Sequence, residues 1–231
     1  MALNSNKTKN AGNEALPPQQ PIDIGTYPAR LVAVVDLGLQ AQSPYQGQEK
    51  EPVYQIQTTY ELLDEFMKDE EGNDLEDKPK WLSEKFALYG PNAEKAKSTK
   101  RYKALDPNNI HDGDWVALLG TPCMVTVVHN PNKKDPTKPP YVNIGNVSAM
   151  RAKEAEKAAP LVNATLAFDL DNPDVEVFNK LPQWVQKLVK GNLEYEGSKL
   201  EKLLANQPQE KEEGKKADVS DADLEAENPY D

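Results

Sequence analysis

The sequence has little of what disulfides and metal sites require. Its 231 residues include one cysteine, Cys123, and two histidines, His111 and His129. A single cysteine excludes a disulfide within the chain, and these three residues do not have the spacing of zinc ligands. Cys123 falls in an apolar segment, where a small core residue is far more common than a nucleophile. We expect no bound metal, and a reducing compartment.

Long apolar runs are missing as well. No stretch of the sequence is apolar over the roughly 20 residues that a membrane-spanning helix needs. The first residues are rich in Asn, Gln and Pro with scattered Lys, and they lack the apolar centre of a signal peptide. The sequence therefore predicts a cytoplasmic protein without a membrane span.

The glycine motifs of nucleotide-binding and hydrolytic enzymes are also absent. Neither G-x-x-x-x-G-K-[ST], nor G-x-G-x-x-G, nor G-x-S-x-G occurs in the sequence. The acidic stretch 69–74 resembles a calcium loop, but Gly72 stands at its fourth position rather than its sixth. We expect no cofactor and no enzymatic activity, although abundant carboxylates leave a nuclease-like metal site open as an alternative.

What the sequence does have is charge, unevenly distributed. The net charge of −11 argues at first against binding to nucleic acid. However, the segment 217–231 holds six acidic residues and no basic one, and a second acidic block runs over 61–77. Basic residues gather instead at 95–103 and at 133–138. Because the local field rather than the net charge steers a polyanion, these two segments are candidate phosphate-binding sites.

The middle of the chain predicts strands. Side chains alternate between two faces in 25–39 and 53–63, 81–89 is strand-like, 123–129 is β-branched and apolar, and 141–150 returns as a strand. The segment 115–119 is a further short apolar segment. Residues 91–105 fit either a short helix or a loop. The segment 130–140 is rich in Pro and Lys and reads as the tip of a long hairpin. We expect a mainly β core, an OB-fold-like five-stranded barrel.

Four regions follow from composition and pattern. Residues 1–21 form a disordered arm, 22–150 the β core with an acidic insertion at about 64–80, 151–206 a small helical appendage, and 207–231 a disordered acidic tail. In the appendage, Asn172 before Pro173 is typical of a helix start, and Ser198 with Glu201 fits a capping box.

Cations and flat rings occur together, as single-stranded nucleic acid requires. Cations follow the phosphates, and aromatic faces accept unstacked bases at about 1–3 kcal/mol each. An OB-fold places this site on strands 2 and 3 and in the loops 1–2 and 4–5. The candidate DNA-binding residues are Tyr45, Tyr54, Tyr60, Trp81, Tyr89, Lys95, Lys97, Lys100, Arg101, Tyr102, Lys103, Lys133, Lys134, Lys138 and Tyr141.

Each candidate has a plainer interpretation. Aromatic residues on strands are core residues more often than not, and a run of lysines on a helix is often only a solvated face. Lysines at a hairpin tip are exposed almost by necessity. The acidic end carries Leu224, Pro229, Tyr230 and Asp231, which fit a tail that docks on basic pockets of other proteins. A tail that only improves solubility is the alternative.

Three segments resemble a group of bacteriophage single-stranded DNA-binding proteins: GTYPARL at 25–31, STKRY at 98–102 and LPQWVQ at 181–186. The acidic end is similar to the tails of bacterial single-stranded DNA-binding proteins, which contact replication and repair enzymes. It departs from them because Asp231 follows the near-terminal aromatic Tyr230. The resemblance implies an OB-fold, a role in phage DNA replication or recombination in the host cytoplasm, and replication or recombination proteins as partners.

The leading hypothesis is therefore a sequence-tolerant single-stranded DNA-binding protein. The alternative is a phage virion or assembly protein, a β domain that binds other proteins and no nucleic acid. An enzyme ranks third, because the motifs above are missing.

Overall fold

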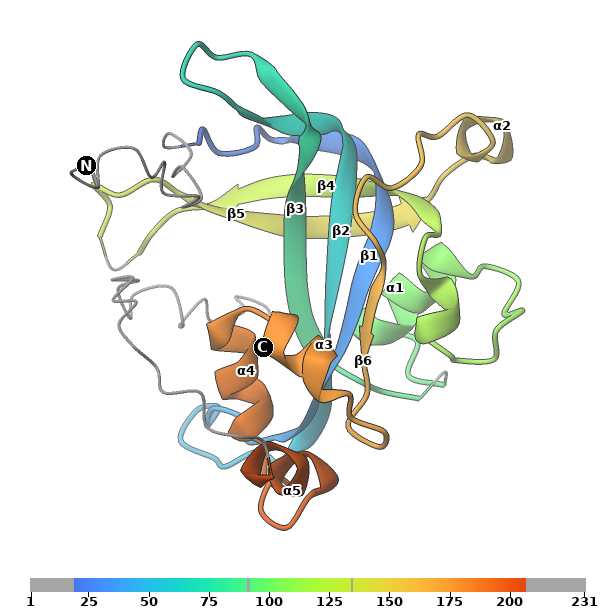
Figure 1. The fold of residues 1–231 in the computed structure, drawn as a ribbon. Coiled ribbons are helices and arrows are strands. Elements are labelled where there is room, and N and C mark those ends of the chain that lie inside the picture. Colours follow the sequence, from blue (N-terminus) through green and yellow to red (C-terminus); the bar gives the residue numbers. More distant parts are fainter. Residues whose placement is uncertain (1–18, 91, 134, 207–231) are drawn as a thin grey trace, which may run out of the picture.

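The computed structural model describes residues 19–90, 92–133 and 135–206. The predicted mainly β class is confirmed (Figure 1). The strands are β1 (Gly25–Gln40), β2 (Val53–Lys68), β3 (Asp74–Ala87), β4 (Pro122–Asn130), β5 (Tyr141–Ala149) and the short β6 (Leu166–Phe168). The helices are α1 (Lys97–Leu105), the 3₁₀ turn η2 (Val116–Leu118), α2 (Ala152–Ala155), α3 (Val175–Lys180), α4 (Gln183–Lys190) and α5 (Lys199–Ala205).

One bent sheet organises the β core, in the order β3-β2-β1-β4-β5. The first part of β1 pairs with β4 and its later part with β2, all antiparallel. Where β4 has left β1, β6 takes its place in parallel along Ala33–Val35. Register shifts after Leu31 and after Asp36 bend β1, as bulges do. In Figure 1, β3, β2 and β1 stand upright while β4 and β5 cross behind them.

The sheet is not closed, which differs from the expected barrel. Its edges are β3 and β5, and no ladder joins them among the described residues. Side chains from elsewhere fill this seam. Ile22, from the segment before β1, is buried in the core, and its carbonyl accepts a hydrogen bond from His129 Nε2 at 2.7 Å. Further along the seam, Arg101 of α1 contacts both edge strands. The seam is thus sealed by packing and hydrogen bonds instead of a strand ladder.

The main core lies inside the bend of the sheet, where α1 and η2 cover it. Residues at a spacing of two point into it from β4 and from the first part of β1, as the period of two predicted. The register shift after Leu31 then places Val34 in this core and turns Val35 to the other face of the sheet. Trp115 packs there against Phe86 in a tilted arrangement and against Tyr102 edge-on, with ring centroids 5.6 Å and 5.4 Å apart. The short apolar segment 115–119 contains the turn η2. This turn is only three residues long and caps the core rather than pairing with a strand.

The acidic stretch expected as an insertion belongs to the sheet. Strands β2 and β3 continue into it as a hairpin whose turn is held by Asp69, with its carboxylate accepting from the Asn73 backbone N–H at 2.7 Å. Strand β3 therefore begins at Asp74, earlier than the sequence pattern indicated. The backbone hydrogen bonds between β2 and β3 do not require apolar side chains. The two strands therefore stay paired beyond the core, into the acidic stretch.

A second core joins the appendage to the outer face of β1. Val35 and Leu37 of β1 pack there against Phe168 of β6 and the apolar faces of α3, α4 and α5. Gly38 allows the close approach: its φ is +74°, and a Cβ there would lie 2.8 Å from Asn192 Cγ. Figure 1 shows α3 and α4 in front of the upright strands.

The helix starts follow from capping. Ser198 accepts a hydrogen bond from Glu201 N at 3.1 Å, which confirms the predicted capping box. Helix α3 begins at Val175 rather than at Pro173, because the Asp174 side chain caps it. None of the helices in the described ranges is long and apolar enough to cross a bilayer.

Candidate nucleic-acid interface

The structure divides the seven predicted aromatic residues into three classes. Four are 46–49% exposed, two are buried, and Tyr141 is partly buried. The exposed ones are Tyr45, Tyr54, Trp81 and Tyr89. Tyr60 is completely buried in the main core, since it lies in the middle of β2 with its ring toward the interior. Burial raises the pKa of the Tyr60 hydroxyl, and the ring is too enclosed for a nucleotide base to stack on it.

Tyr102 is a core residue as well, in contrast to its predicted role. Its ring packs edge-on against Trp115, and its hydroxyl accepts a hydrogen bond from Gly113 N at 2.8 Å. The same hydroxyl lies 3.4 Å from Asp106, which also accepts from two backbone N–H groups of the following turn. Tyr102 therefore fixes the connection between α1 and η2 and presents no free face.

Arg101 lies in the seam between β3 and β5, which corrects its assignment to a phosphate site. Its guanidinium donates to both oxygens of Glu84 on β3, at 2.7 and 3.2 Å. It also donates to Asn146 Oδ1 at 3.2 Å and to the Gly145 carbonyl at 3.4 Å, both on β5. Only 4% of the residue is exposed. Arg101 thus joins the two edge strands with four of its five N–H donors and is buried away from any phosphate.

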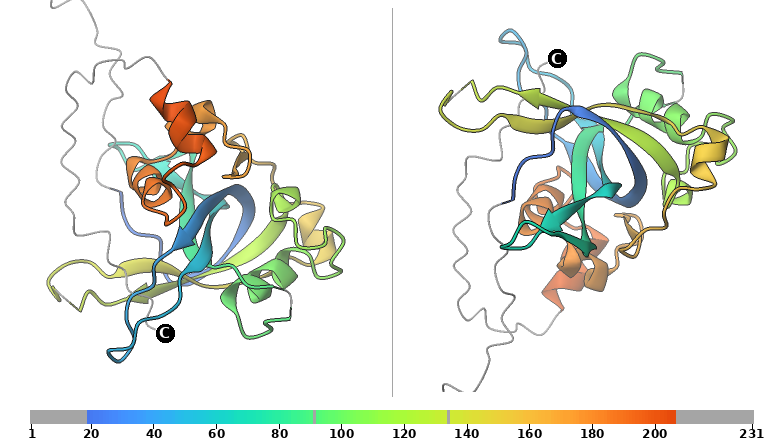
Figure 2. Two further views of the ribbon diagram at one scale, coloured as in Figure 1. Left: turned by 90° about the horizontal axis from the view of Figure 1, so that it is seen from below. Right: turned by 90° about the horizontal axis from the view of Figure 1, so that it is seen from above.

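The lysines of the same basic run remain on the surface. Lys95, Lys100 and Lys103 are exposed, while Lys97 lies 3.6 Å from Glu84 and shares that carboxylate with Arg101. Figure 2 shows α1 on one side of the molecule and the β4–β5 hairpin reaching out on the other. The two basic segments of the sequence therefore do not meet in one site.

The tip of the β4–β5 hairpin presents its lysines to solvent. Lys133 and Lys138 are exposed, and neither has an ion pair among the described residues, whereas Lys134 lies outside those residues. Asp135 is occupied within the tip, where it accepts from the Thr137 hydroxyl at 2.6 Å, and this bond lowers the pKa of Asp135. Tyr141 is partly buried where the tip enters β5.

Trp81 lies beside the base of this hairpin. It lines a shallow apolar groove with Met67, Leu82, Val142 and Ile22, flanked by Lys80 and the segment 19–21. Because Val142 belongs to β5, the groove runs along the seam from β3 to the strand that carries the hairpin tip. The indole N–H of Trp81 donates to Glu61 Oε2 at 3.1 Å, which leaves the ring at the surface.

A second aromatic group lies at the other end of the β2–β3 pair. Leu88 N donates to the Tyr54 carbonyl at 2.7 Å, so Tyr54 and Tyr89 belong to the same end. The Tyr54 hydroxyl donates to Glu194 at 3.0 Å, and this bond raises its pKa. Tyr45 lies in the β1–β2 loop with the Lys50 ammonium 5.0 Å from its ring centroid. At about 3.3 Å per residue, some 20 Å of β3 separates Trp81 from this group.

Sequence reasoning missed the cation between these two groups, Lys85. Trp81, Ser83 and Lys85 alternate with the inward residues of β3, and all three are exposed. Lys85 has no ion pair among the described residues. The signal was the period of two in WLSEKFALY, which places Lys85 on the same face as Trp81. The outer face of β3 therefore offers a ring, a cation and, beyond the strand end, a second group of rings.

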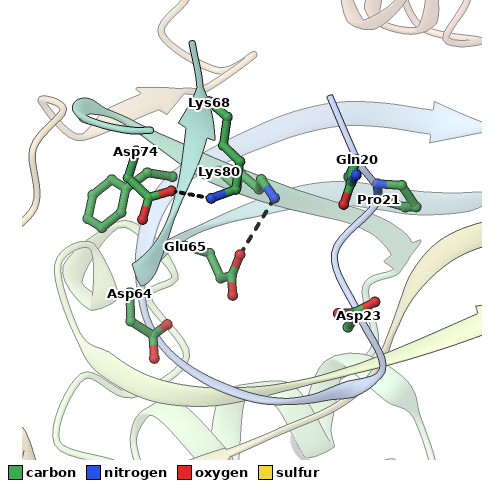
Figure 3. Close-up of a pocket in the computed structure, with 9 residues that line it drawn as sticks. Gln20, Pro21, Asp23, Asp64, Glu65, Lys68, Asp74 and Lys80 are labelled. Carbon is green, nitrogen blue, oxygen red and sulfur yellow. Dashed lines mark hydrogen bonds and ion pairs between the residues drawn. The ribbon is translucent and has the colours of Figure 1, made fainter. Parts of the chain in front are cut away.

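An acidic pocket bounds this surface near the start of β3 (Figure 3). Its carboxylates are Asp23, Asp64, Glu65 and Asp74. Its lysines are both paired: Lys68 with Asp74 at 2.7 Å and Lys80 with Glu65 at 3.5 Å. Burial and the nearby Glu65 raise the pKa of Asp64. Its excess of carboxylates disfavours phosphate, and among the described residues no three His, Cys, Asp or Glu side chains are placed so that they could hold a metal ion.

The tail residues Leu224, Pro229, Tyr230 and Asp231 lie outside the described residues. Comparison with known proteins identifies no relative: no protein-family model, no curated protein and no solved structure matches the chain. The geometry of the site is thus the ground on which a function is inferred.

Proposed function

We propose that the chain is a sequence-tolerant single-stranded DNA-binding protein, without catalytic activity, and that DNA runs along the outer face of β3. Bases stack on Trp81 at one end and on Tyr89 at the other, and Lys85 holds a phosphate between them. Lys133 and Lys138 hold the strand where it passes the hairpin tip.

The observation that carries this proposal is the alternation along β3. Between Trp81 and Lys85 its exposed residues are Trp81, Ser83 and Lys85, whereas Val35 and Leu37 on the outer face of β1 pack against the appendage. Gln57, Thr59 and Glu61 of β2 are buried. An uncovered strip that combines a ring with a cation matches what a single strand needs, since every base has a flat face and every nucleotide a phosphate.

The sheet topology supports an OB-fold for the core. Strand β1 pairs with both β2 and β4, so pairing of β3 with β5 would complete a five-stranded barrel. An OB-fold is a partly open barrel that binds oligonucleotides on strands 2 and 3 and in the loops 1–2 and 4–5. Those two loops leave the sheet on the same side in Figure 2. We extend the proposal to phage DNA replication or recombination, with partners bound by the acidic tail, on the resemblance of the three segments given above.

Titration of the purified full chain with oligo-dT tests the proposal. We expect quenching of tryptophan fluorescence, much weaker binding of a duplex of equal length, and an affinity that falls as salt rises. Trp184 on α4 is also exposed, whereas Trp115 is buried. In a Trp184→Phe variant the remaining exposed tryptophan is Trp81, so quenching on DNA binding is assigned to it. The absence of oligo-dT binding in dilute buffer would favour the alternative, a β domain that binds other proteins.

A further inference from the structure

Glu61 is a fully buried carboxylate with an unusual number of donors. It is 0% exposed, on the outward face of β2. Its Oε1 accepts from Val162 N at 2.7 Å. Its Oε2 accepts from Trp81 Nε1 at 3.1 Å, from Asn163 N at 3.3 Å and from Asn163 Nδ2 at 2.7 Å. A buried carboxylate is stable only when its oxygens are satisfied, and four N–H donors do this here.

These donors come from two distant parts of the chain. Trp81 lies opposite Glu61 in the β2–β3 ladder, while Val162 and Asn163 belong to the segment that leads from α2 to β6. Glu61 is therefore the point at which the appendage, the sheet and the exposed indole are joined. The backbone bond to Val162 and the side-chain bond to Trp81 depend on the same carboxylate.

The bond to Glu61 restricts the Trp81 ring. An outward tryptophan on an edge strand otherwise samples several rotamers, and ordering it on binding costs free energy. With its N–H tied at one edge, the indole keeps a fixed orientation beside the groove while 48% of the residue stays exposed. The stacking face is thus ordered before any base arrives.

We propose that Glu61 is a positioning residue for nucleic-acid binding: it holds Trp81 in its stacking orientation and makes the docked appendage part of the binding site. This inference rests on the proposed function. Glu61 has no contact with the DNA; it acts through Trp81, and Val162 and Asn163 hold Glu61 in place.

A double-mutant cycle with Glu61→Gln and Trp81→Phe tests the coupling. Glutamine keeps one acceptor oxygen and places an NH2 group where the other oxygen was, so the four donors lose one of their two acceptors. Because one stacked base contributes about 1–3 kcal/mol, we expect Glu61→Gln to weaken oligo-dT binding about fivefold or more. Phenylalanine stacks but has no N–H, so in the Trp81→Phe background the same change should cost less than about twofold, the usual error of additivity. Equal losses in both backgrounds would overturn the proposal.

A measurement without DNA separates positioning from the proposed function. In a Trp184→Phe protein, the decay of tryptophan fluorescence anisotropy reports Trp81 beside the buried Trp115. We expect Glu61→Gln to add a fast, sub-nanosecond component. The matched control is Glu84→Gln, which alters a buried glutamate on the same strand pair that binds Arg101 rather than Trp81. It should destabilise the fold and leave the decay of Trp81 unchanged.

The outcomes are distinct. If the unmodified protein does not bind oligo-dT while Glu61→Gln adds the fast component to the anisotropy decay, the proposed function fails and the restraint on Trp81 stands. If the anisotropy decay is the same in both proteins, the positioning role of Glu61 is refuted whether or not DNA binds. Each variant is measured at a temperature where circular dichroism shows it folded.

Discussion

The two lysine-rich segments look alike in sequence and differ in the folded protein. In the first, over 95–103, the central cation Arg101 is buried and bound to Glu84, Asn146 and Gly145. In the second, over 133–138, the described lysines are exposed and unpaired within the part of the chain that the structure covers. One segment seals the sheet, and the other leaves its charge available to a polyanion.

The difference shows that a run of positive charge acquires its role from the carboxylates that face it. Glu84 points inward from β3 with a side chain only 7% exposed, so it requires a cation, and Arg101 supplies a guanidinium that matches it with two bonds. Among the described residues, Lys133 and Lys138 of the hairpin tip form no ion pair with a carboxylate. Asp135, the acid nearest in sequence, already accepts bonds from Thr137.

The largest effect is expected at Arg101. Removing one partner of a buried, hydrogen-bonded pair leaves a buried charge uncompensated, so Arg101→Ala should lower the free energy of unfolding by about 3–5 kcal/mol. Lys103→Ala, two residues away and exposed, should change it by less than about 0.5 kcal/mol. Urea denaturation followed by circular dichroism measures both. Similar values for the two variants would mean that Arg101 does not lock the seam.

The next effect concerns the exposed ring nearest the hairpin. Trp81→Ala should cost about 1–3 kcal/mol of oligo-dT binding, since it removes a stacking face. Trp184→Ala is the control, because Trp184 is also exposed but lies on α4, away from the proposed path. Fluorescence polarisation of labelled oligo-dT gives both affinities. A greater loss with Trp184→Ala would move the interface from β3 to the appendage.

A smaller effect distinguishes the two basic segments directly. Each phosphate contact adds about 0.7 to the slope of log affinity against log salt for single strands. We expect the pair Lys133→Ala and Lys138→Ala to reduce this slope, and Lys85→Ala to reduce it as well. The pair Lys100→Ala and Lys103→Ala on α1 should leave it nearly unchanged. The reverse result would place the DNA on the α1 side.

The smallest effect is expected on the pH dependence of stability, at Asp36. In contrast to Glu84, this carboxylate lies beside other acids rather than beside a cation. Burial raises the pKa of Asp36, and the neighbouring Asp169 and Asp171 raise it further. Since the folded-state pKa lies above the unfolded value, the stability that Asp36 contributes is complete below the unfolded pKa and is lost as pH rises through the folded pKa. Asp36→Asn keeps an oxygen for Gly38 N, which now donates to Asp36 Oδ1 at 2.8 Å.

The expected outcome is a variant that gains stability relative to the original protein as pH rises from about 4 to 7. Thermal unfolding at both pH values measures the gap. A gap of equal size at the two values would show that ionisation of Asp36 carries no cost in the folded protein.

The sequence by itself determined the local features. A period of two predicted the strands, Ser198 with Glu201 predicted a helix start, and the composition of 130–140 predicted an exposed basic tip. These features depend on neighbours a few residues apart, which a sequence displays directly. The alternation also placed Trp81 and Lys85 on one face of β3.

Only the tertiary structure decided which of those residues are accessible. Tyr54 and Tyr60 share the parity of β2, yet Tyr60 lies under α1 and η2 in the core, whereas Tyr54 lies at the strand end. Arg101 forms a hydrogen bond with Asn146, 45 residues away in sequence, and Glu61 forms one with Val162, 101 residues away. Periodicity fixes the face to which a side chain points, but what covers that face depends on contacts between segments far apart in the chain.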